Sequence, residues 1–571
     1  MKMVKSLILG SAAGLVAMSG AQAADLPVKA KAVEYVRICS LYGAGFYYIP
    51  GTDTCVKIGG YLRSDVTIHG GQSNQPLLGG DGAVNTRYLN QYNDYSRFAL
   101  TMDTRTATEY GVVRTFGQAD FTFGTQGYSG AMSNSSNTTG SVLTGGTVNN
   151  YAGNGGLGVE YAFIQFAGFT FGKSASAYVT PWQGFPGNNT AFLFGGYDTI
   201  TGINNVQYTA QFGNGVSASI GVDDSSANDY NRTGIVNAAL AGSVSSPANT
   251  LVPTSANTAS CALAMYGAAS SNCTSLGTAY GGAQLPDLVG NVRVDQAWGV
   301  FQVSGALHDV TPGYWTVANT LTNGNFLGGQ AQTNAQNIGH PDSKVGGAVN
   351  VALQIKNLPT GAGDDFKIEG SWSLGASKYV LGTSAPLGGS FYQFGDGPTG
   401  SAGKLAIGAI TDGVYSGGPG NNGGVGSVPL QLTQGLGIRG AFNHNWSPEW
   451  SSSLFGGASQ LSYNNTAKTT WCASYVAAGT GLIANPFTGQ ASKCDPGFTI
   501  SEIGLTTRWT PVKNLTFSSE VLYAYLHTNM QGAATGTASS AFPIQAGTAA
   551  SPYVFGDKGT VSFNMRVQRN F

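Results

Sequence analysis

The last eleven residues of the chain, Val561 to Phe571, alternate between two kinds of side chain. Odd positions carry Val, Phe, Met, Val, Arg and Phe, whereas even positions carry Ser, Asn, Arg, Gln and Asn. Because a β-strand sends successive side chains to opposite faces, this segment predicts a strand with one nearly apolar face and one polar face. At about 3.3 Å per residue, the strand is long enough to cross a bilayer at a tilt. An edge strand of a soluble β-sandwich would have a similar pattern, so the rest of the chain has to decide between the two.

The first 23 residues have the three parts of a secretory signal peptide. Lys2 and Lys5 supply the basic start, an apolar run extends from Leu7 to Met18, and Ala21-Gln22-Ala23 is a small-residue cleavage site. We therefore expect an exported protein that begins at Ala24. No later stretch has about 18 apolar residues in a row, which argues against membrane-spanning helices but not against spanning β-strands.

The composition is rich in turn-forming and aromatic residues and poor in charge. Glycine accounts for 85 of 571 residues, Tyr and Phe for 27 each, and charged residues for only 10%. A soluble β-protein of this size would usually carry more surface charge. The net charge of −1 gives no reason to expect a nucleic-acid partner.

From Val56 onward, pairs of strand-like segments are joined by tight turns that hold Gly, Pro or Asn. Seven such turns lie at about Thr106–Thr108, Phe166–Phe169, Phe212–Val216, Ala297–Val300, Asn357–Asp364, Asn445–Trp450 and Trp509–Leu515. With the strands that start at Val56 and Val561, the count reaches sixteen. Alternation slips near Arg114, which predicts a β-bulge there.

The other connections are long and rich in Gly, Ser, Thr and Asn. They cover about 71–92, 125–155, 175–202, 224–284, 310–341, 380–431, 464–499 and 529–555. Short turns on one side and long loops on the other are typical of outer-membrane barrels. Trp298, Trp446, Trp450 and Trp509 all lie at the tight turns, as expected of an aromatic girdle at the membrane interface.

These observations predict an all-β fold, a 16-stranded antiparallel transmembrane β-barrel with short periplasmic turns and long extracellular loops. We assign residues 1–23 to the signal peptide, 24–55 to an N-terminal periplasmic-side segment and 56–571 to the barrel. Closing the sheet satisfies the strand edges that lipid cannot.

The six cysteines fall into three pairs that are close in sequence: Cys39 and Cys55, Cys261 and Cys273, Cys472 and Cys494. Six cysteines allow fifteen connectivities, and the simplest joins each neighbour pair. We expect disulfides in an oxidising compartment. No Cys-x-x-Cys spacing is present, so we predict no metal site.

A sixteen-stranded barrel would enclose a water-filled bore. Strand parity turns a set of mostly charged side chains toward it: Lys57, Arg63, Asp65, Arg97, Asp103, Arg105, Glu160, Arg293, Asp295, Arg439, Arg508 and Arg566. Arginines there would attract anions and carboxylates would attract cations. The alternative is that any one of these charges is merely solvated, with no selective role.

The third long connection has an unusual number of apolar residues for a loop that faces water. The residues that stand out are Trp182, Phe185, Phe192, Phe194, Tyr197 and Asp198. A loop folded into the bore and packed on its wall would cover the aromatic side chains. Asp198 would then face the wall arginines across a constriction. The alternative is an external loop packed on its neighbours.

Several of these segments resemble the alphaproteobacterial porin family. The most specific is Gly45 to Arg63, which reads GFYYIPGTDTCVKIGGYLR; others are Ser96–Ala99, Asp103–Gly111, Ala162–Ser174 and the terminal Phe571. The resemblance implies homotrimers of sixteen-stranded barrels in the outer membrane. It also implies passive passage of small hydrophilic solutes and ions, with one loop narrowing the pore and no cofactor.

A general pore has three functional alternatives. A solute-specific channel would share the fold, and a surface adhesin or receptor would work through its long loops. A barrel enzyme is disfavoured because the chain has no Gly-x-Ser-x-Gly and no His-Glu-x-x-His. The five histidines, His69, His308, His340, His444 and His527, are expected to be solvated residues at strand ends or in loops.

Overall fold

The computed structural model describes residues 38–70, 74, 76, 84–85, 91–124, 156–190, 193–197, 201–225, 232–238, 280–315, 339–382, 391–396, 403–417, 426–475, 482–534 and 552–571. The predicted signal peptide, Cys261, Cys273, Phe192 and Asp198 lie outside these residues. No helix within them has both the length and the apolar character needed to cross a membrane.

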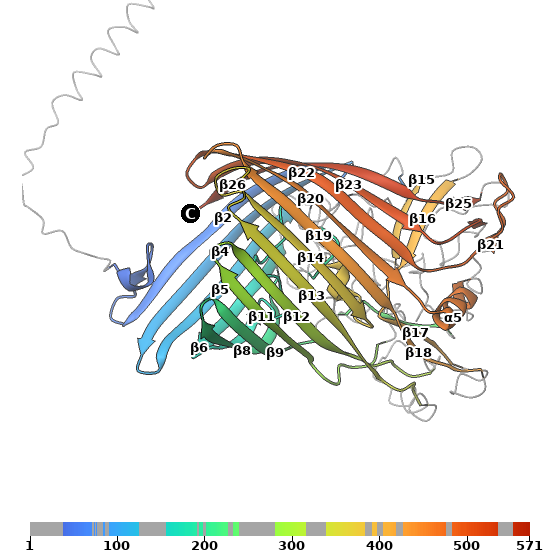
Figure 1. Cartoon of the computed structure of the whole chain (residues 1–571), viewed down its shortest axis with the longest axis horizontal. Helices are drawn as coiled ribbons and strands as arrows, with labels where there is room; N and C mark the ends of the chain where they lie inside the picture. The colour runs from blue at the N-terminus through green and yellow to red at the C-terminus, as the bar shows by residue number, and fades with distance from the viewer. Residues whose placement is uncertain are drawn as a thin grey trace, which may run out of the picture. The chain divides into compact units, whose positions relative to one another are not determined.

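Within the described part of the chain, sixteen long strands form one closed antiparallel barrel (Figure 1). Each strand pairs with its neighbours in chain order, and the first and last pair with each other. The strands are β2 (Thr54–Ile68), β4 (Tyr92–Thr108), β5 (Gly111–Gly124), β6 (Gly156–Phe166), β7 (Phe169–Ser174), β8 (Ile203–Gly213), β9 (Val216–Asp223), β11 (Asp287–Gln296), β12 (Gly299–Val310), β13 (Lys344–Lys356), β14 (Asp365–Leu374), β19 (Gln434–Asn445), β20 (Trp450–Ser462), β22 (Phe498–Val512), β23 (Leu515–Thr528) and β26 (Lys558–Asn570).

The two faces of this sheet differ in chemistry. One face exposes large apolar side chains along the strands, including Leu62, Leu100, Ile220, Val292 and Ile503. The opposite face is mostly buried and carries the charged side chains. An apolar belt of this extent is what a bilayer requires of a spanning barrel. At the tight turns, Trp298, Trp446, Trp450 and Trp509 are exposed, where interface aromatics are expected.

The predicted terminal strand closes the barrel. β26 pairs with β2 from Tyr61↔Asn570 to Ile68↔Phe563. The backbone of Phe571 exchanges hydrogen bonds with that of Gly60, at 3.1 and 3.2 Å. A Cβ at position 60 would lie 2.0 Å from the carbonyl oxygen of Ala99, so only glycine fits this junction.

The seven tight turns lie where the sequence predicted them, with one shift. The turn between β4 and β5 is at Glu109 and Tyr110, slightly after the predicted Thr106–Thr108, because regular pairing continues to Thr108↔Gly111. The predicted bulge near Arg114 was also misplaced. Arg114 pairs regularly with Arg105, and the register shift comes at Gln118 and Ala119, where β5 meets β6.

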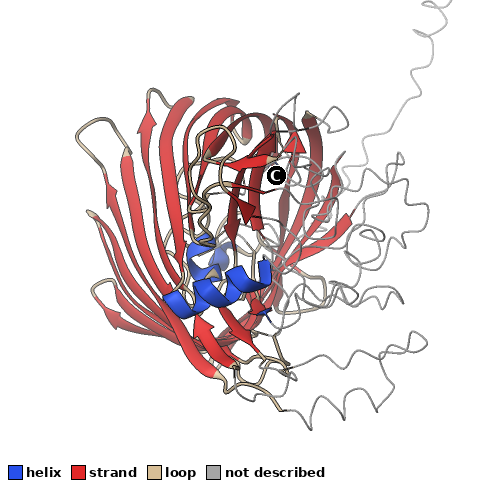
Figure 2. Ribbon diagram, turned by 90° about the vertical axis from the view of Figure 1, so that its right-hand side faces the viewer, coloured by secondary structure: helices blue, strands red, loops and turns tan. Residues whose placement is uncertain are grey.

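The long connections carry elements of their own. These are β3 (Val84–Asn85), β10 (Ile235–Asn237), α4 (Lys378–Leu381), β15 (Phe391–Asp396), β16 (Gly403–Ala409), β17 (Gly413–Ser416), β18 (Val428–Leu432), α5 (Asn465–Tyr475), β21 (Leu482–Ile483), β24 (Ala533–Ala534) and β25 (Tyr553–Phe555). Figure 1 labels α5, β15, β16, β17, β18, β21 and β25 at one end of the barrel, and Figure 2, which faces that end, shows both helices in front of the barrel strands.

Residues 38–56 form a small unit by themselves. A 3-10 helix (Ser40–Tyr42) and β1 (Tyr47–Tyr48) surround the disulfide between Cys39 and Cys55, which packs with Phe46. β1 pairs antiparallel with Cys55 and Val56.

Candidate functional site

The connection between β7 and β8, residues 175–202, is called the inner loop below, and its described residues, 175–190, 193–197 and 201–202, are folded inside the barrel. Its described apolar side chains pack on inward-facing residues of distant strands. Phe194 is fully buried against Phe498 and Ile500 of β22, and Leu193 against Phe455 of β20. The loop is therefore packed on the wall opposite β7 and β8, the two strands that it joins.

The aromatic residues that marked this loop in the sequence have different environments. Tyr197 is buried, and its ring stacks on Tyr379 at 5.0 Å between centroids. Phe185 is partly buried, with the guanidinium of Arg439 5.2 Å from its ring centre. Trp182 is also partly buried.

Arginine side chains hold the backbone of the inner loop. Arg439 donates to the carbonyl oxygens of Leu193 (3.2 Å) and Tyr197 (2.6 Å) and pairs with Glu369 at 2.5 Å. Both side chains of this ion pair are fully buried. Arg439 thus lies between the wall and the loop and does not meet solvent.

Two further predicted wall arginines contact the same loop. Arg508 donates to the carbonyl oxygen of Gly187 at 2.5 Å, and Arg566 to that of Asn189 at 2.6 Å. Four guanidinium-to-carbonyl contacts therefore hold the loop from three strands, β19, β22 and β26, that are far from β7 in the chain.

Carboxylates supply the remaining polar anchors. Glu520 accepts hydrogen bonds from the backbone of Asn189 and from the hydroxyl of Thr190 (2.7 Å), and also from Thr506 (2.7 Å). Glu502 accepts from the backbone N–H of Phe194 at 3.1 Å. Backbone donors and acceptors of a loop inside a barrel need such partners, because the apolar packing excludes water.

The inward-facing side chains of β26, β2, β4, β5 and β6, called the polar wall below, are more exposed. The side chains of Arg105 and Arg114 are 30% and 29% exposed and that of Arg63 is 16% exposed, whereas those of Arg439 and Glu369 are 0% exposed. The inner loop therefore covers one side of the interior and leaves charged side chains accessible on the other.

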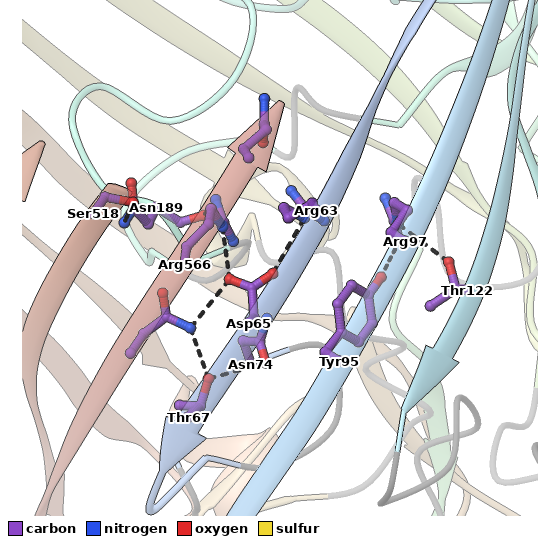
Figure 3. A network of polar contacts seen from close by, with 12 residues as sticks. Arg63, Asp65, Thr67, Asn74, Tyr95, Arg97, Thr122, Asn189, Ser518 and Arg566 are labelled. Carbon is purple, nitrogen blue, oxygen red and sulfur yellow. Dashed lines mark hydrogen bonds and ion pairs between the residues drawn. The ribbon is translucent and has the colours of Figure 1, made fainter. Parts of the chain in front are cut away.

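The middle of the polar wall is a network of ion pairs (Figure 3). Asp65 is buried between Arg566, at 2.6 Å, and Arg63, at 3.2 Å. On the next strand, Arg97 pairs with Asp120 at 2.6 Å and with Glu160 at 3.4 Å. The guanidinium of Arg63 also lies 5.6 Å from the ring centre of Tyr95, and that of Arg97 lies 5.3 Å from it. Arginine and tyrosine side chains alternate here, which fixes the arginines in place.

Nearer the tight turns, Asp103 pairs with Arg105 and Arg114, each at 3.0 Å. Lys57 is exposed at the start of β2. Arg293 and Asp295 form a separate pair on β11 at 2.8 Å, and Lys356 joins Asp295 at 3.1 Å. The predicted charged residues are thus brought together in three places: on the polar wall, on β11, and between the wall and the inner loop.

Comparison with known proteins identifies the family. A family model described as "Porin subfamily" matches residues 25–549. The chain belongs to this porin subfamily. Porins are channels rather than enzymes, and this porin is an outer-membrane protein.

Two relatives and one solved structure illustrate the likeness. Porin Omp2b of Brucella suis biovar 1 and Porin Omp2b of Brucella abortus are each 38% identical over 239 residues, which is 41% of this chain. The porin covers 58% of the length of these curated relatives. The outer membrane channel DcaP of Acinetobacter baumannii superposes with a TM-score of 0.50 at 12% identity, over 92% of this chain and 99% of DcaP, and so shares the fold.

One histidine expectation was wrong. His308 of β12 is buried, 2.7 Å from Asp287 and 3.1 Å from the hydroxyl of Tyr280. It faces inward near the long-loop end, where a folded connection covers it, so its position at a strand end does not expose it. Within the described residues, no group of His, Cys, Asp or Glu side chains could hold a metal ion.

Sequence reasoning missed several residues of the site. Arg114 was overlooked because the predicted bulge hid its parity, although regular alternation from Gly111 would have turned it inward. Glu369, Glu502 and Glu520 also lie on inward positions of predicted strands. Their parity was a usable signal, but nothing in the sequence indicated that a distant loop would contact them.

Proposed function

We propose that this porin is a passive diffusion channel for small hydrophilic solutes and ions, and that it works as a homotrimer in outer-membrane lipid. The observation that carries the proposal is the contrast between the two sides of the interior. The inner loop is packed against β11 to β14, β19, β20, β22 and β23, while the polar wall keeps partly exposed charges. Solutes would pass between the polar wall and the inner loop. The distance between these two surfaces would limit the size of the solutes, and the charges of the polar wall would favour ions of one sign.

The charges of the polar wall favour anions weakly. Apart from Lys558 at the long-loop end of β26, the polar wall has six cationic and four acidic side chains in their ordinary charged forms, which leaves a net charge of +2. The cations are Lys57, Arg63, Arg97, Arg105, Arg114 and Arg566, and the acids are Asp65, Asp103, Asp120 and Glu160. Asp198, proposed to face them from the inner loop, would reduce this preference.

The test is planar-bilayer recording of the purified porin under a salt gradient. Replacing Arg63 and Arg97 by Gln lowers the net charge of the polar wall from +2 to 0, so the reversal potential should move toward that of cations. Arg569→Gln is the matched control, because Arg569 is on the outward face of β26. An unchanged reversal potential in the double variant would remove these two arginines from the filter.

The same recordings separate a general pore from a solute-specific channel. A general pore should conduct in proportion to salt concentration, whereas a binding channel should saturate. A complete lack of conductance from correctly folded protein would overturn the proposal. In that case, a surface adhesin or receptor that works through its long loops would be the better hypothesis.

A further inference from the structure

Described segments of five of the long connections fold together into one assembly, called the cap below. A six-stranded sheet runs in the order β21-β24-β25-β16-β15-β3, and a three-stranded sheet in the order β10-β17-β18. These strands come from the connections that follow β2, β9, β14, β20 and β23. In Figure 1 they gather at the end of the barrel that carries the long loops. Because strand pairing joins these loops to one another, they form one ordered assembly and not separate loops.

The cap has a hydrophobic core of its own. Leu405 and Val414 from the connection after β14 are fully buried against Trp471 of α5 and Phe555 of β25. The disulfide between Cys472 and Cys494 packs on this core. Burial of this extent, drawn from four connections, stabilises a fixed arrangement at the mouth of the barrel.

The cap enters the barrel and lies on its inner wall. Ala406 of β16 and the adjoining Ile410 pack on inward-facing Phe498 and Leu526. The hydroxyl of Thr528 donates to the carbonyl oxygen of Ile407 at 2.6 Å. A Cβ at Gly408 would lie 2.2 Å from the Phe498 ring, so the backbone of the cap touches the wall directly.

The cap is also continuous with the inner loop. Tyr379 of α4 stacks on Tyr197, and Phe194 belongs to the same apolar cluster as Val380 and Leu381. The backbone N–H of Gly195 donates to the carbonyl oxygen of Val380 at 3.3 Å. The obstruction on this side of the interior therefore extends from the inner loop out to the mouth.

One buried carboxylate ties two of the connections in the cap to each other. Asp412 is 0% exposed. One of its oxygens accepts from the backbone and the hydroxyl of Ser377, each at 2.7 Å. The other accepts from the backbone of Thr233 at 2.8 Å and from the hydroxyl of Tyr280 at 2.9 Å. These donors belong to two connections, with Ser377 in the one after β14 and Thr233 and Tyr280 in the one after β9. Removal of the carboxylate therefore releases both connections at once and leaves buried donors unpaired.

We propose that the cap is a second, size-limiting filter in series with the inner loop, and that Asp412 and the Cys472–Cys494 disulfide hold it in place. It packs on the apolar outer ends of β22 and β23, away from Arg105 and Arg114 near the tight turns, so it should limit the size of solutes and leave charge selectivity to the polar wall. This inference rests on the proposed channel function.

The experiment measures single-channel conductance, reversal potential and the uptake of neutral sugars of increasing length into liposomes. Asp412→Ala should raise the conductance and admit longer sugars, while the reversal potential stays the same. The matched control is Asp309→Asn at the outer end of β12, where the carboxylate accepts a hydrogen bond from Thr311. Heat-dependent migration on a gel checks that each barrel is folded.

A second arm keeps the inference testable if Asp412→Ala does not fold. The variant with Cys472 and Cys494 both replaced by Ser should also admit longer sugars, and the variant with Cys39 and Cys55 replaced by Ser should not. If wild-type porin conducts and none of the cap variants changes the sugar cut-off, the cap is not a filter. If wild-type porin does not conduct, the channel function itself fails.

Discussion

At the scale of single residues, the interior is organised by buried ion pairs that hold backbone. Arg439 and Glu369 are each fully buried, and the guanidinium of Arg439 also donates hydrogen bonds to two carbonyl oxygens of the inner loop. A buried pair of this kind adds little net stability compared with an apolar pair, because both charges lose hydration. Its role is to fix where the loop lies. No pattern in the sequence distinguished this arginine from the accessible ones.

Arg439→Ala should therefore be costly. It leaves the Glu369 carboxylate buried without its counter-charge, which costs about 3–5 kcal/mol. The expected result is a lower thermal unfolding midpoint of the barrel in detergent, measured by the loss of its β-sheet circular dichroism. Replacing both Arg439 by Met and Glu369 by Gln should restore much of the loss, since no charge then remains buried. Equal losses in the single and double variants would contradict this account.

At the scale of elements, the strands and turns could be predicted because their signals are local. Alternation of two side-chain types identified the sixteen strands, and Gly, Pro or Asn marked the seven turns. The cap could not be predicted in this way. Its strands are two to seven residues long and pair across connections that are far apart in sequence. For Phe194 and Tyr197, the sequence predicted packing on the barrel wall but not which strands they contact.

The turn between β13 and β14 gives a prediction at this scale. Burial disfavours the charged form of Asp364, but hydrogen bonds from Thr360, the backbone of Asn445 and His444 outweigh it and lower the pKa from 3.8 to about 2. Since this pKa is depressed in the folded state, the stabilisation is complete above pH 4 and is lost as the pH falls toward 2. Asp364→Asn should remove that part of the acid sensitivity.

The measurement for this variant is the unfolding midpoint between about pH 6 and pH 2. Wild-type porin should lose stability faster than Asp364→Asn below pH 4. The Asp309→Asn variant should keep the wild-type profile, because Asp309 is at the opposite end of the barrel. Parallel profiles for wild type and Asp364→Asn would show that the turn carboxylate does not contribute.

At the scale of the whole molecule, the interior is divided lengthwise. The inner loop and the cap occupy the side formed by β11 to β14, β19, β20, β22 and β23, and the polar wall lies on β26, β2, β4, β5 and β6. Strand parity predicted which residues face inward, and the sequence correctly placed one loop inside. It could not separate arginines that contact solvent from arginines that anchor a loop, because this depends on what packs against each one.

Deleting residues 178–198 tests this division directly. The deletion removes the obstruction beside the polar wall, so single-channel conductance should rise. It also exposes two carboxylates, Glu502 and Glu520, and two guanidinium groups, Arg439 and Arg508, whose charges cancel, so conductance should change more than ion selectivity. The barrel should remain closed, because β7 and β8 pair without the loop. A deletion confined to residues 128–150, between β5 and β6, serves as the control of similar length. If conductance is the same in both deletions and in the wild type, the inner loop does not narrow the path of the ions.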